Sequence, residues 1–178
     1  PEAEHGGFYQ AVADGTYEKY GLKVTIVAKA DQAMPLGGKI QFYMQGNLLG
    51  TFSAAEQDVP VVEVAAIFQK DPQIIMAHPE SGLKEFGDLG KLKSLFIGDD
   101  LYVSGFRWMT SAYPSIKDEQ RKPYNYSVAP FLADKDSGQQ GYLTSEPFAV
   151  KKEGGFEPTV FLMADAGYST TATMIESM

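Results

Sequence analysis

Within residues 3–26 a helical hydrophobic pattern passes directly into a strand pattern, and this transition constrains the fold more than any other stretch of the chain. Apolar side chains first recur at helical spacing, at Phe8, Ala11, Val12 and Tyr20. From residue 22 to residue 26 apolar and polar residues alternate, which is typical of a β-strand. Gly21 ends the helix as a C-cap, so the sequence predicts a helix that leads straight into a strand, as in α/β folds.

The segment before this helix has two interpretations. Glu4, His5, Gly6 and Gly7 supply no hydroxyl cap, and adjacent glycines let the backbone approach a bound molecule closely. Free N–H groups at a helix N-terminus favour a partially negative ligand. The alternative is that the glycines only form a loop, as short glycine motifs often do.

The alternation of helices and strands continues through the first half of the chain. Residues 40–44 form a predicted strand, Asn47 is a plausible N-cap of a helix over residues 48–57, and residues 60–69 form a nearly continuous apolar run. Such runs are typical of parallel strands buried on both faces. This order predicts an α/β fold with a mostly parallel sheet.

Residues 73–77 form a further predicted strand before the loop around Gly82, and the pattern restarts after this loop. We then expect strands at residues 93–98, 124–128, 141–144 and 159–164. We expect helices at residues 81–89, 104–113, 115–122, 130–140 and 171–178. Because the pattern restarts near Lys93, the sequence predicts two lobes, at residues 1–88 and 90–163, with residues 164–178 crossing back toward the first lobe.

Charge and composition exclude several function classes. The 178 residues carry a formal net charge of −8, whereas a nucleic-acid-binding surface needs a basic stripe. Cysteine is absent, which excludes disulfides, thiolate metal sites and cysteine nucleophiles. The most apolar run, residues 59–68, is too short to cross a membrane and contains Glu63. Since Pro1 is not a natural start, we expect a processed or truncated N-terminus.

Five segments of the chain, taken in order, resemble one protein family. They are EHGGFYQAVADGTYEKYGLKVTI, GGKIQFYMQGN, VPVVEVAAIFQKDPQIIMAHPESGLKEFGDL, GYLTSEPF and ADAGYSTTAT. Together they resemble the periplasmic solute-binding proteins of ABC importers in the nitrate, sulfonate, taurine and thiamine-pyrimidine group. The resemblance implies a two-lobed type II periplasmic-binding-protein fold with the ligand in the cleft between the lobes. Family members begin with an earlier strand and continue further, so by this comparison the chain is truncated at both ends.

The resemblance also implies partners and a location. A solute-binding protein of this kind works in the periplasm or elsewhere outside the cytoplasm, as a monomer that passes a small molecule to the membrane permease of an ABC importer. The family also includes eukaryotic thiamine-pyrimidine synthases, which carry a cysteine-rich motif and a reactive histidine. The absence of cysteine argues against an enzyme, and we expect no catalytic residue, cofactor or metal. A sensor or an orphan lobe without a transport role is a third option.

Ten residues are predicted to contact the ligand, from the resemblance and from their positions after strands. They are His5, Asn47, Gln69, Asp100, Ser104, Trp108, Thr144, Ser145, Glu146 and Tyr168. In open α/β sheets ligands bind beyond the carboxyl ends of the strands, and Asn47, Asp100 and Glu146 follow predicted strands. The alternatives are an N-cap role for Asn47, a core position for Trp108 and a solvated turn for Glu146. His78 is expected at the surface.

The predicted site favours a flat heterocycle that carries an amino group. Glu146 can accept hydrogen bonds from an exocyclic amine and a ring nitrogen, while Trp108 and Tyr168 cover the faces of the ring. An aminopyrimidine precursor of thiamine has this chemistry. A sulfonate or nitrate instead needs helix N-termini and cationic groups, and the glycine pair before the first helix and Lys70 keep this alternative open.

Overall fold

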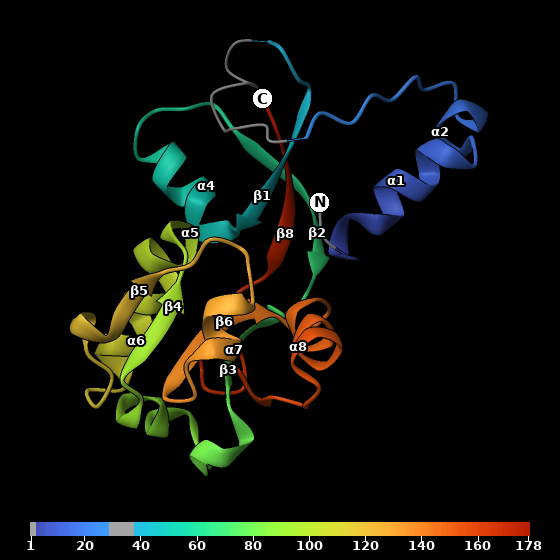
Figure 1. The fold of residues 1–178 in the computed structure, drawn as a ribbon. Coiled ribbons are helices and arrows are strands. Elements are labelled where there is room, and N and C mark those ends of the chain that lie inside the picture. The colour runs from blue at the N-terminus through green and yellow to red at the C-terminus, as the bar shows by residue number, and fades with distance from the viewer. Residues whose placement is uncertain (1–2, 29–37) are drawn as a thin grey trace.

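A computed structural model of the protein describes residues 3–28 and 38–178, and this part of the chain forms two β-sheets with surrounding helices (Figure 1). One sheet has three strands in the order β1-β8-β2, and the other has five in the order β5-β4-β6-β3-β7. The strands are β1 (Phe42–Asn47), β2 (Val62–Phe68), β3 (Gln73–Ala77), β4 (Ser94–Ile97), β5 (Arg121–Pro123), β6 (Ser137–Tyr142), β7 (Thr159–Leu162) and β8 (Ala172–Ser177). The α/β class predicted from the sequence is confirmed.

The helices are short, and several are single turns. The α-helices are α1 (Gly6–Ala13), α2 (Thr16–Lys19), α4 (Leu48–Ala55), α5 (Asp99–Leu101), α6 (Arg107–Ala112), α7 (Ala129–Ala133) and α8 (Glu146–Gly154). The 3-10 turns are η1 (Ala3–His5), η2 (Pro79–Ser81), η3 (Phe86–Lys91) and η5 (Asp118–Gln120), and η4 (Tyr102–Phe106) is a π-helical turn. α5, η4 and α6 follow one another without a break, so the helix predicted at residues 104–113 is part of a longer helical run.

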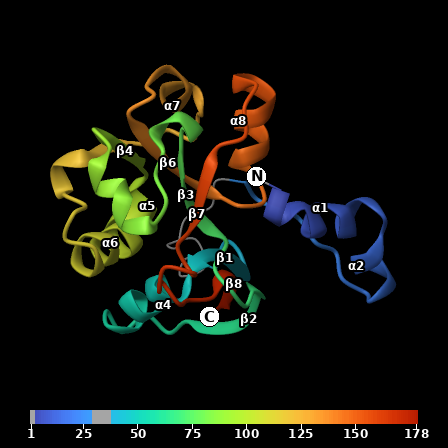
Figure 2. The same ribbon diagram turned by 90° about the horizontal axis from the view of Figure 1, so that it is seen from below.

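The five-stranded sheet carries helices on both faces. β4 runs parallel to β5 and β6, and β3 pairs antiparallel with β6 and β7. β3 is buried along its whole length, and its alternate residues face opposite sides of the sheet. Ile75 and Ala77 pack in a core with η3, η4 and α6, whereas Ile74 and Met76 pack with α7 and α8. Figure 2 shows α5 and α6 on one side of these strands and α7 and α8 on the other.

The three-stranded sheet is antiparallel, with β8 in its centre. Ile175 of β8 lies opposite Met44 of β1 and Ala65 of β2. The prediction of a parallel strand buried on both faces at residues 60–69 is therefore wrong. β2 is an edge strand, and Val62 is 59% exposed. A continuous apolar run does not by itself distinguish a central strand from an edge strand with one uncovered face.

Pairing with distant strands overrides the local pattern in two further segments. The helix predicted at residues 171–178 is wrong, because the segment forms β8 between two partner strands. The helix predicted at residues 130–140 ends early, since α7 stops at Ala133 and β6 follows. β6 contains Gln139 and Gln140, and both are buried between β3 and β4. The strand predicted at residues 141–144 contains only the last two residues of β6, because the polar residues before them gave no strand signal and pairing with the neighbouring strands determines their structure.

Three shorter predictions in the second half also fail. η2 and η3 take the place of the helix predicted at residues 81–89. η5 and β5 replace the helix predicted at residues 115–122. The strand predicted at residues 124–128 is irregular, because the pairing with β4 ends at Pro123.

α1 and α2 form an N-terminal arm that projects from the body of the molecule (Figures 1 and 2). The strand predicted at residues 22–26 is wrong, because no strand of the described chain pairs with this segment. Its alternate apolar residues Val24 and Ile26 instead line an apolar pocket of about 610 Å³ with Phe8 and Tyr43. The alternating pattern therefore reflects one apolar face, without sheet pairing.

The chain passes between the two sheets at the β2–β3 and β7–β8 connections. β3 belongs to the five-stranded sheet, whereas the sequence placed residues 73–77 in a first lobe of residues 1–88. After β7 the chain returns to the three-stranded sheet through residues 163–171 and ends there as β8. The backbone N–H of Asp71 in the first connection donates a hydrogen bond to the carbonyl oxygen of Thr170 in the second, at 3.1 Å.

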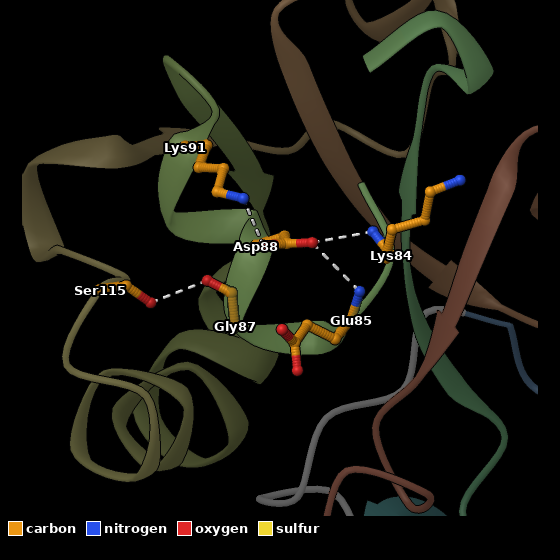
Figure 3. A network of polar contacts seen from close by, with 6 residues as sticks. All are labelled: Lys84, Glu85, Gly87, Asp88, Lys91 and Ser115. Atoms are coloured by element: carbon orange, nitrogen blue, oxygen red, sulfur yellow. Dashed lines mark hydrogen bonds and ion pairs between the residues drawn. The ribbon is translucent and has the colours of Figure 1, made fainter. Parts of the chain in front are cut away.

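A network around Asp88 holds the connection between β3 and β4 (Figure 3). Oδ2 of Asp88 accepts hydrogen bonds from the backbone N–H groups of Lys84 at 2.8 Å and Glu85 at 3.2 Å, and Oδ1 accepts one from Nζ of Lys91 at 2.6 Å. These contacts, the one with Lys91 foremost, lower the pKa of Asp88 to about 2. Asp88 therefore fixes the start of η3 beside the sheet.

His78 lies in the core, and the prediction that it is a surface residue is wrong. It is 2% exposed, and its Nε2 lies 2.8 Å from the carbonyl oxygen of Phe131. Its ring packs on Phe131 and Phe156, with centroid distances of 4.4 and 4.9 Å. The imidazole is buried because it follows the central strand β3 and has both a polar partner and aromatic neighbours.

Candidate functional site

The parallel strands β4, β5 and β6 end at the same edge of the five-stranded sheet, and polar or aromatic residues follow each of them. Asp100 follows β4, Tyr124 and Tyr126 follow β5, and β6 ends with Tyr142, shortly before Glu146. The carboxyl edge of parallel strands is where ligands bind in open α/β sheets. These residues therefore form the candidate site.

Glu146 is fixed by hydrogen bonds to two of its neighbours. It is 7% exposed and is the first residue of α8, where the helix dipole favours a carboxylate. Its Oε2 accepts a hydrogen bond from the backbone N–H of Tyr142 at 2.7 Å, and its Oε1 accepts one from the hydroxyl of Tyr124 at 3.1 Å. The carboxylate thus joins the ends of β5 and β6.

Two tyrosine rings stand at the end of β5. The centroids of Tyr124 and Tyr126 are 5.1 Å apart, with the rings tilted by 48°. The hydroxyl of Tyr126 lies 3.5 Å from Oδ1 of Asp100, at the long limit of a hydrogen bond. Tyr126 is 64% exposed. The start of α5, which carries Asp100, is held to β6, since the N–H of Gly98 donates to Oε1 of Gln140 at 2.6 Å.

A cavity of about 350 Å³, here called the tyrosine compartment, lies between this edge, the three-stranded sheet and the N-terminal segment. It is lined by Glu4, His5, Met44, Gln45, Gly46, Asp100, Tyr124, Tyr126, Gln140, Gly141, Tyr142, Glu146 and Thr173. The lining includes three carboxylates and three tyrosines, and no Lys or Arg within the described residues. The compartment therefore suits a flat ligand that carries hydrogen-bond donors or a positive charge.

A second cavity of about 550 Å³, here called the aliphatic compartment, adjoins the first. It is lined by Gln45, Gly46, Asn47, Leu49, Gly50, Ala54, Gln57, Val59, Val61, Gln73, Asp100, Val103, Ser104 and Tyr142. The two compartments share Gln45, Gly46, Asp100 and Tyr142. Together they form one cleft between the two sheets.

Five of the ten predicted site residues line this cleft. His5 and Glu146 line the tyrosine compartment, Asn47 and Ser104 line the aliphatic compartment, and Asp100 lines both. Asn47 also caps α4, since its side-chain oxygen accepts a hydrogen bond from the N–H of Leu49 at 3.0 Å. The two roles weighed for Asn47 are therefore compatible.

The other five predicted residues lie away from the cleft lining. Trp108 and Tyr168 pack against each other at the edge of the core, with ring centroids 5.2 Å apart, and Tyr168 is 5% exposed. Burial raises the pKa of Tyr168. Thr144 and Ser145 form the turn before α8, and Nε2 of Gln69 donates to the carbonyl oxygen of Ala66 at 3.2 Å.

Sequence reasoning missed several lining residues, above all Tyr124, Tyr126 and Tyr142. Tyr124 and Tyr126 were assigned to a strand at residues 124–128, whereas the strand ends before them. Had the boundary been placed at Pro123, the rule that ligands bind beyond strand ends would have selected both tyrosines. Tyr142 was placed inside a strand predicted at residues 141–144, whereas it is the last residue of β6.

In the part of the chain that the structure describes, no three His, Asp or Glu side chains are grouped to hold a metal ion. No helix among residues 3–28 and 38–178 is long and apolar enough to span a membrane.

Comparison with known proteins gives matches among solved structures and families, and none among curated protein sequences. An ABC uptake transporter substrate-binding protein from Streptococcus pneumoniae, solved with bound histidine, matches with a TM-score of 0.61 and 20% identity over 96% of this chain and 69% of that one. A protein from Methylobacillus flagellatus assigned as a periplasmic sulfonate-binding protein matches with a TM-score of 0.60 and 16% identity, over 90% and 51% of the two chains.

A third structure, from Wolinella succinogenes, is assigned as a binding component of an ABC transporter and was solved with lysine. It matches with a TM-score of 0.60 and 15% identity, over 94% of this chain and 70% of that one. The chain thus spans between about half and 70% of these structures. Their similarity shows that the chain has the α/β fold of type II periplasmic-binding proteins. The sequence profile of the NMT1/THI5-like family matches residues 2–175, nearly the whole chain, and the protein therefore belongs to the NMT1/THI5-like family.

Proposed function

We propose that the protein binds a small solute in the cleft between its sheets and delivers it to the permease of an ABC importer, and that the solute is an aminopyrimidine precursor of thiamine. One observation carries the choice of solute. The tyrosine compartment combines the carboxylates of Asp100 and Glu146 with the rings of Tyr124 and Tyr126, and no Lys or Arg of the described chain lines it.

An aminopyrimidine has the chemistry that this lining recognises. Its flat ring can stack on Tyr126, which lines the compartment and is 64% exposed. Its exocyclic amine can donate to Asp100, which is exposed and lines both compartments. Glu146, whose carboxylate accepts hydrogen bonds from Tyr124 and Tyr142, adds a second negative charge to the same lining.

The stacking role assigned from the sequence to Trp108 and Tyr168 passes in this proposal to Tyr124 and Tyr126. The rings at residues 108 and 168 contact each other and the core, whereas those at residues 124 and 126 line the tyrosine compartment. Both pairs of rings were chosen for the same physical requirement, which is an aromatic face next to a carboxylate.

Backbone strain supports a binding role for the same compartment. Among the described non-glycine residues, positive φ angles occur at Asp58 (55°), Tyr126 (60°) and Thr173 (54°). Tyr126 and Thr173 both line the tyrosine compartment. Non-glycine residues held in this sparsely populated region are frequent at ligand-binding sites, because the surrounding structure fixes them there for function.

A sulfonate or nitrate is the weaker alternative. Oxyanions bind to cationic side chains or helix N-termini, and a nearby carboxylate opposes them. Lys70, which kept this alternative open, lies outside both compartments and forms an ion pair with Asp165. Gly6 and Gly7, the other groups weighed for an anion, begin α1 and line neither compartment, whereas the preceding Glu4 adds a carboxylate to the tyrosine compartment.

The transport role, the location and the oligomeric state are proposed from the family to which the chain belongs. The relatives in solved structures are substrate-binding proteins of ABC transporters, so we propose a permease as the partner and a site of action outside the cytoplasm. We propose a monomer that binds its solute without converting it. Co-purification with a permease would separate this role from that of a sensor.

Isothermal titration calorimetry tests the choice of solute. The chain is titrated with hydroxymethylpyrimidine, its formylamino analogue, taurine and nitrate under the same conditions. We expect heat of binding with at least one pyrimidine and none with taurine or nitrate. Binding of an oxyanion together with no binding of either pyrimidine would overturn the proposal.

A further inference from the structure

The aliphatic compartment is not needed to hold one pyrimidine ring. The tyrosine compartment has a volume of about 350 Å³, near the lower end of the range of about 300–1,000 Å³ for small-molecule sites. The adjoining compartment adds a larger space of about 550 Å³. A ligand that filled the tyrosine compartment alone would leave this second space unoccupied by ligand.

The two compartments share one charged residue in their linings. Asp100 lines both, together with Gln45, Gly46 and Tyr142. Among the described residues that line the aliphatic compartment, Asp100 carries the one formal charge. A positive charge on the ligand is therefore best placed next to Asp100, because this carboxylate attracts it from either compartment.

The apolar residues that line the aliphatic compartment come from three parts of the fold. Leu49 and Ala54 lie on α4, Val59 and Val61 precede β2, and Val103 lies on the π-helical turn η4. Leu49 is 41% exposed and Val103 is 67% exposed. Apolar surface in a concave site gains free energy when a ligand removes it from water. π-helical turns are themselves frequent at functional sites.

We infer that the cleft takes a ligand of two parts, an amino-substituted aromatic ring in the tyrosine compartment and a second ring or chain in the aliphatic compartment, with a positive charge at Asp100 between them. This inference rests on the proposed function. It extends that function by assigning a second binding site, formed by α4, the segment before β2 and η4, which recognises the size and the apolar surface of the ligand's second part.

The test compares two ligands of equal charge. Aminomethylpyrimidine carries one positive charge and one ring, whereas thiamine carries the same pyrimidine joined through its methylene to a thiazolium ring. Calorimetry is expected to give a dissociation constant for thiamine at least about tenfold lower than that for aminomethylpyrimidine. Equal affinities, with both ligands bound, would overturn the inference and leave the proposed function standing.

Two variants locate the second part of the ligand. Val103→Trp fills the aliphatic compartment and is expected to weaken thiamine binding at least about tenfold while changing aminomethylpyrimidine binding less than about twofold. Val62→Trp makes the same change at a valine that is 59% exposed on β2 and lies outside both compartments, and it should alter neither affinity. If Val103→Trp weakened both ligands equally or neither, the inference would be wrong. If neither ligand bound the unaltered chain, the proposed solute and the inference would both fail.

Discussion

The backbone N–H of Asp71 donates a hydrogen bond to the carbonyl oxygen of Thr170 across 3.1 Å, and so joins the two chain segments that run between the sheets. The side chain of Asp71 is fully buried at this point. Its Oδ1 accepts a hydrogen bond from the N–H of Gln73 at 2.9 Å, while Oδ2 has no hydrogen-bond partner within the described chain. Burial raises the pKa of this carboxyl to about 6.

Asp71→Asn is expected to raise the free energy of unfolding near pH 7 by about 3 kcal/mol. In the unfolded chain the carboxyl has its ordinary pKa of 3.8, whereas in the folded protein it is about 6. As the pH rises between these values, the unfolded state loses its proton first, so the folded state becomes less favourable. The variant removes this ionisation. The difference in stability should therefore be small near pH 4, grow with pH, and level off above about pH 6.

Urea unfolding followed by the fluorescence of Trp108 measures this difference across the pH range. Asp136→Asn, at an exposed aspartate, is the matched control and should leave the pH dependence of stability unchanged. A stability difference between Asp71→Asn and the unaltered protein that stayed constant with pH would contradict the prediction.

Asp88→Asn is expected to have the opposite dependence on pH. The hydrogen bonds from Lys91, Lys84 and Glu85 lower the pKa of Asp88 from 3.8 to about 2. The carboxylate therefore stabilises the fold above about pH 4, and this contribution is lost as the pH falls toward about 2. The variant should melt at a lower temperature at neutral pH, and the difference should shrink in acid. Circular dichroism melts at several pH values measure it, and a variant as stable as the parent at neutral pH would contradict it.

Glu146→Gln is expected to weaken aminopyrimidine binding about tenfold and to lower stability by about 1–2 kcal/mol. The carboxylate accepts hydrogen bonds from both Tyr124 and the backbone N–H of Tyr142. A glutamine amide has one acceptor oxygen and one donor nitrogen, so one of these two donors loses its partner. Glu153→Gln, at an exposed position on the same helix, is the control. Calorimetry with the bound pyrimidine measures the effect, and an unchanged affinity would show that the site chemistry is misassigned.

The elements of the fold that could be predicted are those whose own residues determine their secondary structure. Residues 73–77 were predicted as a strand and form β3, because apolar residues occupy both faces of a central strand. Asn47 was predicted as an N-cap and caps α4, since a side-chain amide next to a helical pattern satisfies the first N–H groups. β8 was not predicted, and of β6 only Gly141 and Tyr142 were, because pairing with the strands on either side determines the structure of both segments.

The candidate site likewise contains residues that could be predicted from the sequence and residues that could not. Asp100 and Glu146 could be selected because each follows a strand pattern, and both line the cleft. Trp108 and Tyr168 were selected for their chemistry, but the packing of one ring on the other is a tertiary property that no local pattern contains. Tyr126 was missed because its position depends on the end of a strand only three residues long.

The position of β8 in the middle of the three-stranded sheet sets an order for assembly during translation. Every strand of the five-stranded sheet leaves the ribosome before β8, so that sheet can pair while β1 and β2 still have open edges. Unpaired edges with apolar side chains such as Val62 and Val64 invite association between nascent chains. The cleft takes Gln45 from β1 and Thr173 from β8, so its lining is complete only once β8 has joined the three-stranded sheet.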